Sequence, residues 1–312
     1  MPAMKERRKF FERPEEPRPL RITARDIAIL QNIARFRLVS AAQLAKLDGG
    51  SAQNVSRSLL ALFENGFVER PPAQAASRLL HKGSRPAIYG LTRKGARLLC
   101  DQGHDFRRSA LDGIDKERGA GWRFVEHTVS VTEFLVELEI AARTRQDLSI
   151  LNRAEILEDA PDRKRERQVR IGATVRLDGV LRRNAVIPDA VFGLRFNDEE
   201  ESYFMLEIDR GEMPIERYNN LHRTYFAKKI LTYYEASREQ RYIHDLGITN
   251  FRVATVTTTP ERVDQMLEAL NRITEGRGSS MFLFTDEKAL VASNPLDLEW
   301  ASGKGESVRL TD

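Results

Sequence analysis

Two short apolar runs decide the fold of the second half of this chain: Val186-Ile187-Pro188-Asp189-Ala190-Val191-Phe192 and Tyr203-Phe204-Met205-Leu206-Glu207-Ile208-Asp209-Arg210-Gly211. Each run is bounded by turn-forming or polar residues, which is typical of a β-strand. The polar residues 197–201 between them predict a hairpin. Because side chains alternate along a strand, Phe204, Leu206 and Ile208 share one face of the second strand, and Met205, Glu207 and Asp209 share the other.

Three acidic side chains, Asp189, Glu207 and Asp209, lie on these two predicted strands. A carboxylate inside an apolar strand is costly to bury unless it is paired or binds a cation. Carboxylates that converge from neighbouring strands suit hard divalent cations, so the pattern predicts a site for Mg²⁺ or Mn²⁺ and metal-assisted phosphodiester chemistry. The alternative is a purely structural cluster in which Arg210 is the ion-pair partner.

Length and composition restrict the class of protein. The 312 residues suffice for two domains or one large one. The chain has no apolar run of membrane-spanning length and no signal-peptide pattern, so we expect a soluble, cytoplasmic protein that does not contact a membrane. A single cysteine, Cys100, excludes an intrachain disulfide framework and a cysteine-based zinc site.

Charge is distributed unevenly along the chain. Residues 1–121 contain 23 Lys and Arg against 13 Asp and Glu, whereas the remainder contains 27 against 33. A basic first part joined to an acidic second part indicates that one part binds a polyanion and the other holds a cation. The alternative is an excess of solvated arginines.

The N-terminal third has a helical pattern after a charged arm, residues 1–20, which is expected to be flexible and loosely attached. Thr23-Ala24-Arg25-Asp26 resembles a capping box at the start of a first helix. Ser40 predicts the cap of a second helix, and Ser51 that of a third, after the turn Asp48-Gly49-Gly50. The third helix is expected to turn Val55, Leu59, Leu62 and Phe63 inward. Three helices with a short glycine turn before the third predict a helix-turn-helix.

The residues after the third helix indicate the winged variant of this motif. Residues 67–70 and 87–91 predict two returning strands, and Thr92 caps a last helix. The run Tyr89-Gly90-Leu91-Thr92-Arg93-Lys94-Gly95 resembles the wing-to-helix junction of many bacterial winged-helix regulators. We therefore expect a winged-helix DNA-binding domain over residues 21–101.

Such a domain binds double-stranded DNA through two sets of side chains. The third helix would enter the major groove, and its candidate base-reading residues are Gln53, Asn54, Ser56 and Arg57. The wing would contact phosphates, with Arg78, Lys82 and Arg85 as the candidates. The alternative is that the winged helix contacts protein and its basic residues are solvated.

Residues 102–121 contain several glycines and mixed charge, and predict a linker. A second domain, residues 122–300, is predicted in the order α-β-β-α-β-α-β, a mixed sheet flanked by helices. Its first long helix is expected from Trp122 to about Arg145, and its second at about residues 214–239. Another helix is expected to start at Thr259-Pro260-Glu261, with proline in its first turn, and the last strand at 281–284. Residues 301–312 are expected to form a loose tail. The expected fold class is therefore a two-domain α+β and α/β protein.

Two motifs resemble known families. Pro188-Asp189, followed about 18 residues later by Glu207-Ile208-Asp209, resembles the PD-(D/E)XK nuclease core, whose order is helix, strands, helix, strand. The run 206–214, together with Ala227-Lys228-Lys229-Ile230-Leu231-Thr232-Tyr233, is similar to the replication-relaxation family. These are bacterial, plasmid- and mobile-element-associated proteins with an N-terminal winged helix and a C-terminal nuclease-like domain. The resemblance covers about residues 23–273.

The sequence departs from the nuclease pattern at one position. The pattern requires a lysine two residues after the second carboxylate, and this chain has Asp209 there. A lysine at that point would polarise the scissile phosphate or help to activate water. The resemblance implies that Lys228 or Lys229 on the following helix supplies this charge, with Tyr233 one turn beyond Lys229. Glu126 or Glu133 on the preceding helix would be an additional metal ligand, or a surface residue.

Two functions follow from the resemblance. The first is a DNA-targeted endonuclease in which Asp189 and Glu207 bind the metal, Asp209 assists and Lys229 or Lys228 stabilises the transition state. It would act in replication or transfer control of a plasmid or mobile element. The second is a non-catalytic regulator whose nuclease fold is a dimerisation scaffold. A homodimer is left open because no sequence feature demonstrates one.

Overall fold

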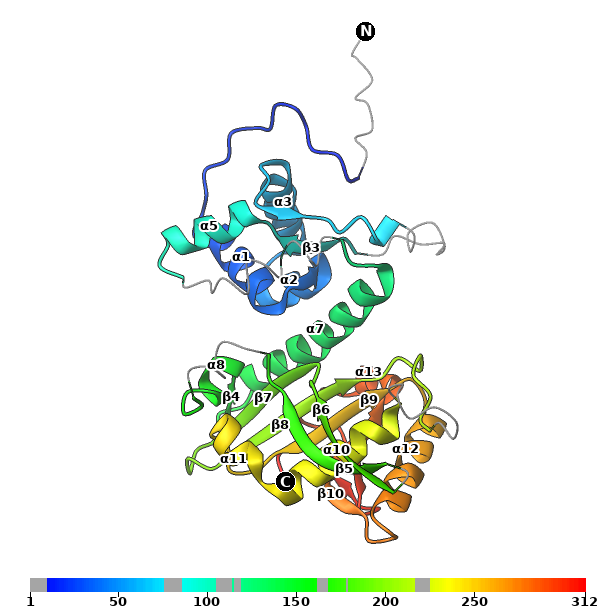
Figure 1. The fold of residues 1–312 in the computed structure, drawn as a ribbon. Coiled ribbons are helices and arrows are strands. Elements are labelled where there is room, and N and C mark those ends of the chain that lie inside the picture. Colours follow the sequence, from blue (N-terminus) through cyan, green and yellow to red (C-terminus); the bar gives the residue numbers. More distant parts are fainter. Residues whose placement is uncertain are drawn as a thin grey trace. The chain divides into compact units, whose positions relative to one another are not determined.

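The computed structural model describes residues 10–75, 86–104, 114, 119–161, 168–177, 179–216 and 225–312 (Figure 1). The chain divides into two compact units, residues 1–136 and 137–312, and helix α7 (Trp122–Arg143) crosses the division. The predicted linker lies largely outside the described residues, and the domain limits drawn from the sequence stay predictions. Within the described part, no helix has both the length and the apolar character needed to cross a membrane.

The helices of the first unit are fixed by polar caps and apolar faces. Helices α1 (Ala24–Phe36) and α2 (Ala41–Asp48) each begin with a capping box, formed by Thr23 with Asp26 and by Ser40 with Gln43. The first of these boxes was predicted as such. Helix α3 (Ala52–Glu64) buries its predicted face, Val55, Leu59, Leu62 and Phe63.

A three-stranded antiparallel sheet lies beside these helices in the order β1-β3-β2. Strands β2 (Val68–Glu69) and β3 (Ile88–Leu91) fall within the predicted segments. Strand β1 (Leu38–Ser40) was not predicted, because three residues are too short for a periodic pattern. Helix α5 (Arg93–Asp101) follows β3 and has Thr92 as its predicted cap. Residues 122–136 of α7 also belong to this unit, where Thr132 donates to the carbonyl of Leu38.

The expectation of a loose N-terminal arm is wrong for residues 10–20. The Arg13 guanidinium donates hydrogen bonds to the carbonyls of Phe63 and Val68. Arg70 donates to the carbonyl of Phe10 and lies over the Phe10 ring at 4.4 Å. Cation–π contacts and backbone hydrogen bonds attach this segment to the unit, and charge alone did not reveal them. Residues 1–9 lie outside the described residues.

The second unit is built on a seven-stranded mixed sheet in the order β12-β11-β10-β9-β8-β7-β4. Strand β8 (Glu201–Ile208) is antiparallel to β7 (Ala190–Phe196) and parallel to β9 (Arg252–Thr257). Strand β10 (Ser279–Asp286) continues the parallel part, and β4 (Leu148–Leu151) forms one edge. The predicted hairpin therefore lies within the sheet, beside its central strand.

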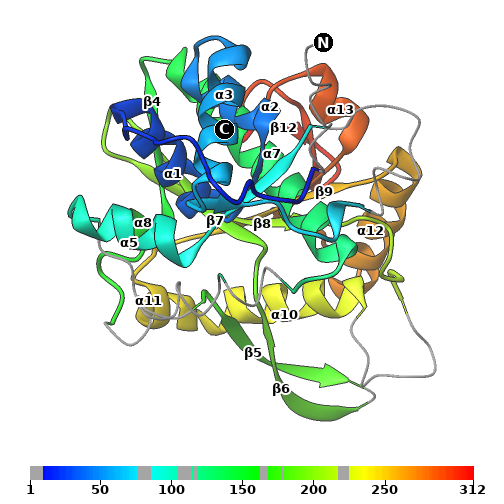
Figure 2. The same cartoon turned by 90° about the horizontal axis from the view of Figure 1, so that it is seen from above.

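Helices and a second small sheet cover one face of the seven-stranded sheet. Helices α10 (Phe226–Glu239) and α12 (Pro260–Ile273) pack against each other and share one hydrophobic core with Met205 and Phe282. Strands β5 (Ile171–Leu177) and β6 (Val180–Val186) form a separate two-stranded sheet. Figure 2 shows α10 between the large sheet and this β5–β6 hairpin. The shorter helices α8 (Arg153–Ile156), α11 (Arg241–Leu246) and α13 (Glu287–Ala292) complete the unit.

Three predicted boundaries in this unit are wrong. Val186 ends β6, and β7 begins only at Ala190 after an irregular segment that contains Pro188. Residues 214–216 are not helical, and α10 begins at Phe226. The predicted loose tail instead forms β11 (Trp300–Gly303) and β12 (Ser307–Val308). Trp300 and Leu310 are fully buried, so apolar burial holds this polar, glycine-containing segment in the sheet.

Candidate functional site

The β7–β8 pairing brings two of the predicted carboxylates together. Ala190 pairs with Leu206, and the amide of Asp189, just before β7, donates to the carbonyl of Leu206 at 2.9 Å, so Asp189 lies beside the end of β8. Its charge acts on Glu207. Oδ2 of Asp189 also accepts a hydrogen bond from the amide of Ile208 at 2.8 Å. This bond fixes the Asp189 side chain at the end of β8.

Helix α10 supplies the partners of Glu207. Nζ of Lys229 lies 2.5 Å from Oε2 of Glu207, and the hydroxyl of Tyr233 donates to Oε1 at 2.7 Å. Lys229 and Tyr233 are four residues apart, so they project from one side of the helix. Glu207 and Tyr233 are each only 1% exposed, whereas Asp189 is half-buried. Lys228 precedes Lys229 on α10 and is half-buried.

Burial and mutual charge shift the ionisation of this cluster. Burial and the nearby charge of Asp189 together raise the pKa of Glu207 to about 7, against the attraction of Lys229. Burial opposes the charged form of Lys229, but Glu207 and Asp189 outweigh it, so the pKa of Lys229 lies above its usual value. Burial and Glu207 hold the pKa of Tyr233 well above its usual value. Tyr233 is therefore a neutral hydrogen-bond donor at neutral pH.

Asp209 faces a different set of partners. Its carboxylate binds the guanidinium of Arg262 through two hydrogen bonds, from Nε at 2.5 Å and from Nη2 at 2.9 Å. The Thr257 hydroxyl donates to Oδ2 at 2.6 Å, and Arg262 also donates to the carbonyl of Met213. The ion pair is largely buried and joins the end of β8 to the first turn of α12. No motif pointed to Arg262, which lies 53 residues from Asp209.

The donor set fits a magnesium-type ion only in part. Within the described part of the chain, no three His, Cys, Asp or Glu side chains are grouped so that they could hold a metal ion. Asp209 does not fit, because both of its oxygens are bound by Arg262. Asp189 and Glu207 agree with Mg²⁺ in number, because Mg²⁺ keeps several waters and needs only one or two carboxylates. Both oxygens of Glu207, however, already accept hydrogen bonds from Lys229 and Tyr233, so an ion would have to displace one of these donors. Thr255, paired in register with Glu207, has a buried hydroxyl without a partner among the described residues, which leaves it able to bond a water.

The predicted base-reading residues lie together on one helix of the first unit. Gln53, Asn54, Ser56 and Arg57 are all exposed on α3, while the opposite face of the helix is buried. The Arg57 guanidinium lies 3.5 Å from the side-chain oxygen of Asn54. The predicted phosphate-binding residues Arg78, Lys82 and Arg85 lie outside the described residues.

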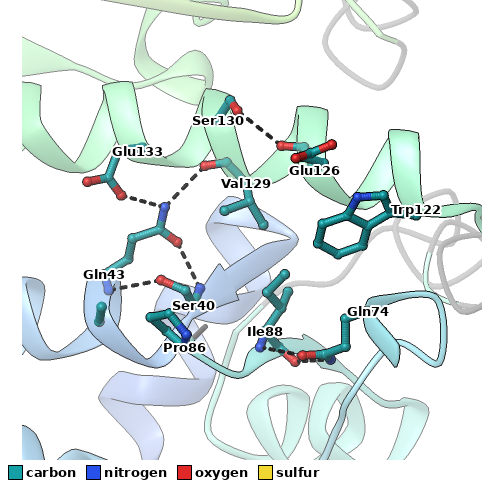
Figure 3. Close-up of a pocket in the computed structure, with 11 residues that line it drawn as sticks. Ser40, Gln43, Gln74, Pro86, Ile88, Trp122, Glu126, Val129, Ser130 and Glu133 are labelled. Carbon is teal, nitrogen blue, oxygen red and sulfur yellow. Dashed lines mark hydrogen bonds between the residues drawn. The ribbon is translucent and has the colours of Figure 1, made fainter. Parts of the chain in front are cut away.

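A cavity of about 440 Å³ lies in the first unit, lined by α2, β3 and α7 (Figure 3). Glu133 accepts a hydrogen bond from the side chain of Gln43 at 2.7 Å and pairs with Lys46. Glu126 and Trp122 line another part of the same cavity. Glu126 and Glu133 thus belong to the packing of the first unit, and their suggested role as metal ligands stays a prediction.

The comparisons with known proteins give one match. The family model described as replication-relaxation matches residues 30–242. This range includes α3, β8 and the part of α10 that carries Lys229 and Tyr233. No curated protein and no solved structure matches the chain. The match covers more than half of the sequence and contains both motifs on which the resemblance was based. The chain therefore belongs to the replication-relaxation family.

Proposed function

We propose that this chain is a double-stranded DNA-binding protein of a plasmid or other mobile element, and that its second unit hydrolyses phosphodiester bonds with Mg²⁺ or Mn²⁺. Membership of the replication-relaxation family supports a role in replication or relaxation of such elements, and with it an involvement of DNA. In this proposal the first unit is a winged helix-turn-helix and the second a PD-(D/E)XK nuclease-like domain. The order α7, β7, β8, α10, β9 agrees with the helix, strands, helix, strand order of that core.

One observation carries the catalytic part of the proposal. Asp189 bonds the end of β8 close enough for its charge to act on Glu207, and the ammonium of Lys229 contacts Glu207 from α10. The cluster thus holds two acids and one lysine, as the nuclease pattern requires, although the lysine comes from the helix and not from the strand. Lys229 would then replace the lysine that the sequence lacks at Asp209.

The residues of the cluster have distinct roles in this proposal. Asp189 and Glu207 would hold the divalent cation, which would supply Lewis-acid stabilisation of the developing phosphate charge. The ammonium of Lys229 would stabilise the same charge by a direct contact. Tyr233 would orient Glu207 by its hydrogen bond. Asp209 would act only through Arg262, because it holds the segment that leaves β8.

The test is cleavage of supercoiled and linear plasmid DNA in the presence of Mg²⁺, Mn²⁺ or EDTA. We expect metal-dependent nicking by the wild type, and loss of nicking in Glu207→Gln and in Lys229→Ala. Two matched controls are Glu201→Gln, at the far end of the same strand, and Lys228→Ala, next to Lys229 on the same helix. Both controls should nick at the wild-type rate. Nicking that survives in purified Glu207→Gln would exclude this site.

A second function is favoured by the hydrogen bonds that the carboxylates of Glu207 and Asp209 already accept from protein groups. Both carboxylate oxygens of Glu207 already accept hydrogen bonds from protein groups, and both oxygens of Asp209 are bound by Arg262. A cluster that is satisfied in this way can be purely structural. The chain would then be a non-catalytic regulator whose second unit is a scaffold. A salt-sensitive gel shift without any nicking would be the result expected for this function.

DNA binding by α3 has its own test. The planar guanidinium of Arg57 can make a bidentate contact with guanine, so Arg57→Ala should weaken binding to a preferred site by about 1–3 kcal/mol and weaken binding to random DNA much less. Leu60→Ala is the matched control, because Leu60 is exposed on the same helix and carries no charge. Gel shifts on a site selected from a random library measure both affinities. An equal loss on all sequences would exclude base reading by Arg57.

A further inference from the structure

The β5–β6 hairpin is a two-stranded ribbon with one covered face and one free face. The inward side chains of β5, Ile171, Ala173, Val175 and Leu177, are buried in the core shared with α10. From β6, Asn184 donates to the Thr232 hydroxyl of α10 at 2.7 Å. Side chains alternate, so the residues between these positions project away from α10. Within the described residues β6 pairs only with β5, so its other edge is unpaired.

Arginine dominates the free face. Arg176 lies opposite Leu181, and Arg183 lies opposite Thr174, so the two arginines occupy diagonal positions on the ribbon. Arg176, Leu181 and Arg183 are all exposed. One guanidinium nitrogen of Arg176 donates to the carbonyl of Gly179 at 2.9 Å, which directs the side chain along the turn.

Few acidic side chains balance the positive charge of Arg176 and Arg183. The described residues of the hairpin, 171–177 and 179–186, contain no Asp or Glu. Glu239 of α10 accepts a hydrogen bond from the Thr174 amide at 2.7 Å, and this backbone bond occupies one of its oxygens at the ribbon's edge. Asp178, which lies between the two strands in sequence, is outside the described residues. The free face is therefore positive over the positions of Arg176 and Arg183.

We propose that the free face of the β5–β6 hairpin is a second DNA-contacting surface, in which Arg176 and Arg183 bind phosphates of a DNA duplex. A two-stranded β-ribbon has dimensions that a major groove admits, and the charge on this face is complementary to the phosphate backbone. The inference rests on the proposed DNA binding, but it assigns contacts to the second unit, which the base-reading residues of α3 do not require.

The same arginines also suit a different purpose. Charged side chains on an unpaired edge strand prevent sheets from joining edge to edge, and Val180 and Leu181 are exposed apolar residues on this edge. Phosphate binding and edge protection predict different effects when an arginine is replaced. Loss of a phosphate contact lowers the salt dependence of DNA binding, whereas loss of edge protection causes self-association.

The experiment compares single arginine variants of the full chain on a duplex of mixed sequence. Each phosphate contact contributes about 0.9 to the slope of log K against log salt concentration. Arg176→Ala and Arg183→Ala should each lower that slope by about 0.9. Arg182→Ala is the matched control, because Arg182 is exposed, adjacent to Arg183 and opposite Val175, on the other face of the same strand. Its slope should stay at the wild-type value.

Each other outcome has a definite consequence. A wild-type slope in both Arg176→Ala and Arg183→Ala overturns the inference, and so does an equal fall in Arg182→Ala, which would show only a general effect of charge. Self-association of the variants in size-exclusion chromatography, at an unchanged slope, assigns the arginines to edge protection. Arg176→Ala and Arg183→Ala could bind DNA as the wild type does while Arg57→Ala binds the preferred site less tightly. In that case the inference fails and the proposed function stands. Absence of any binding by the wild type overturns both.

Discussion

Glu207 shows how tertiary contacts set the chemistry of one residue. On the sequence it is a single acid within an apolar strand, and in the structure it is buried between Asp189 and the donors Lys229 and Tyr233. Asp209, two residues further on and just after the end of β8, has a bidentate arginine as its partner. The two acids differ in their partners because the donors to Glu207 come from α10 and the arginine of Asp209 comes from α12.

The raised pKa of Glu207 predicts a pH dependence of stability. The pKa is about 7 in the folded protein, and an unfolded glutamate titrates near about 4.3, so the folded state binds this proton more tightly. Its contribution to stability is therefore complete below about pH 4 and is lost as the pH rises through 7. The free energy of unfolding should fall over that range by an amount on the order of 1–3 kcal/mol more in the wild type than in Glu207→Gln.

Urea unfolding at several pH values measures this difference. Glu201→Gln serves as the control, because the carboxylate of Glu201 is paired with Arg195 and Tyr203 near the surface and its pKa is lowered. A lowered pKa gives the opposite sign, since stability is then lost as the pH falls. Parallel pH profiles of the wild type and Glu207→Gln would contradict the assigned pKa.

Among the elements of the first unit, α5 packs closely against the residue that precedes β2. Gly95 in the first turn of α5 lies against the carbonyl of Phe67, and the Thr92 hydroxyl donates to the same carbonyl at 2.9 Å. A Cβ at Gly95 would lie 2.2 Å from that oxygen, far inside contact distance. This close approach explains the glycine in the junction motif of residues 89–95.

Gly95→Ala should therefore destabilise the first unit, although alanine is the better helix former by about 1 kcal/mol. The clash with the Phe67 carbonyl should outweigh this gain and cost about 1–3 kcal/mol, as overpacking does. Thermal unfolding followed by circular dichroism measures the change. Gly121→Ala is the control, since a Cβ there meets open space, and it should be neutral. A stabilised Gly95→Ala protein would disprove the close packing.

At the scale of the whole molecule, the C-terminal residues belong to the sheet of the second unit. Trp300 is fully buried in β11, which pairs with β10, and Arg252 of β9 donates to the carbonyl of Asp312 at 2.6 Å. Residues at the end of the chain thus contact the strand next to β8. The stability of the carboxylate cluster consequently depends on a segment far from it in sequence.

Trp300→Ala should cost about 3–5 kcal/mol of unfolding free energy, as expected for a large buried aromatic side chain. Val291→Ala is the control, because Val291 is 89% exposed on α13 and its truncation should change stability by less than about 0.5 kcal/mol. Chemical denaturation with both variants measures the two effects. A stability of Trp300→Ala equal to the wild type would restore the interpretation of residues 301–312 as a loose tail.

Features that depend on local periodicity and capping were predictable from neighbouring residues. The capping box at Thr23, the buried face of α3, the β7–β8 hairpin and the proline-started helix α12 were all predicted, because each is encoded within a few neighbouring residues. The family was also indicated by motifs that are continuous in sequence.

Only the tertiary structure decided which charged groups meet. The pairing of Lys229 with Glu207, the capture of Asp209 by Arg262 and the incorporation of residues 300–312 into the sheet join segments from 22 to 60 residues apart. No local pattern specifies such partners, because they are fixed by strand order and by the faces that α10 and α12 cover. The β5–β6 ribbon was missed for a related reason. One face of the ribbon packs on α10 and the other face is free. Its mixed polar and apolar residues can be assigned to these two faces only when the position of α10 is known.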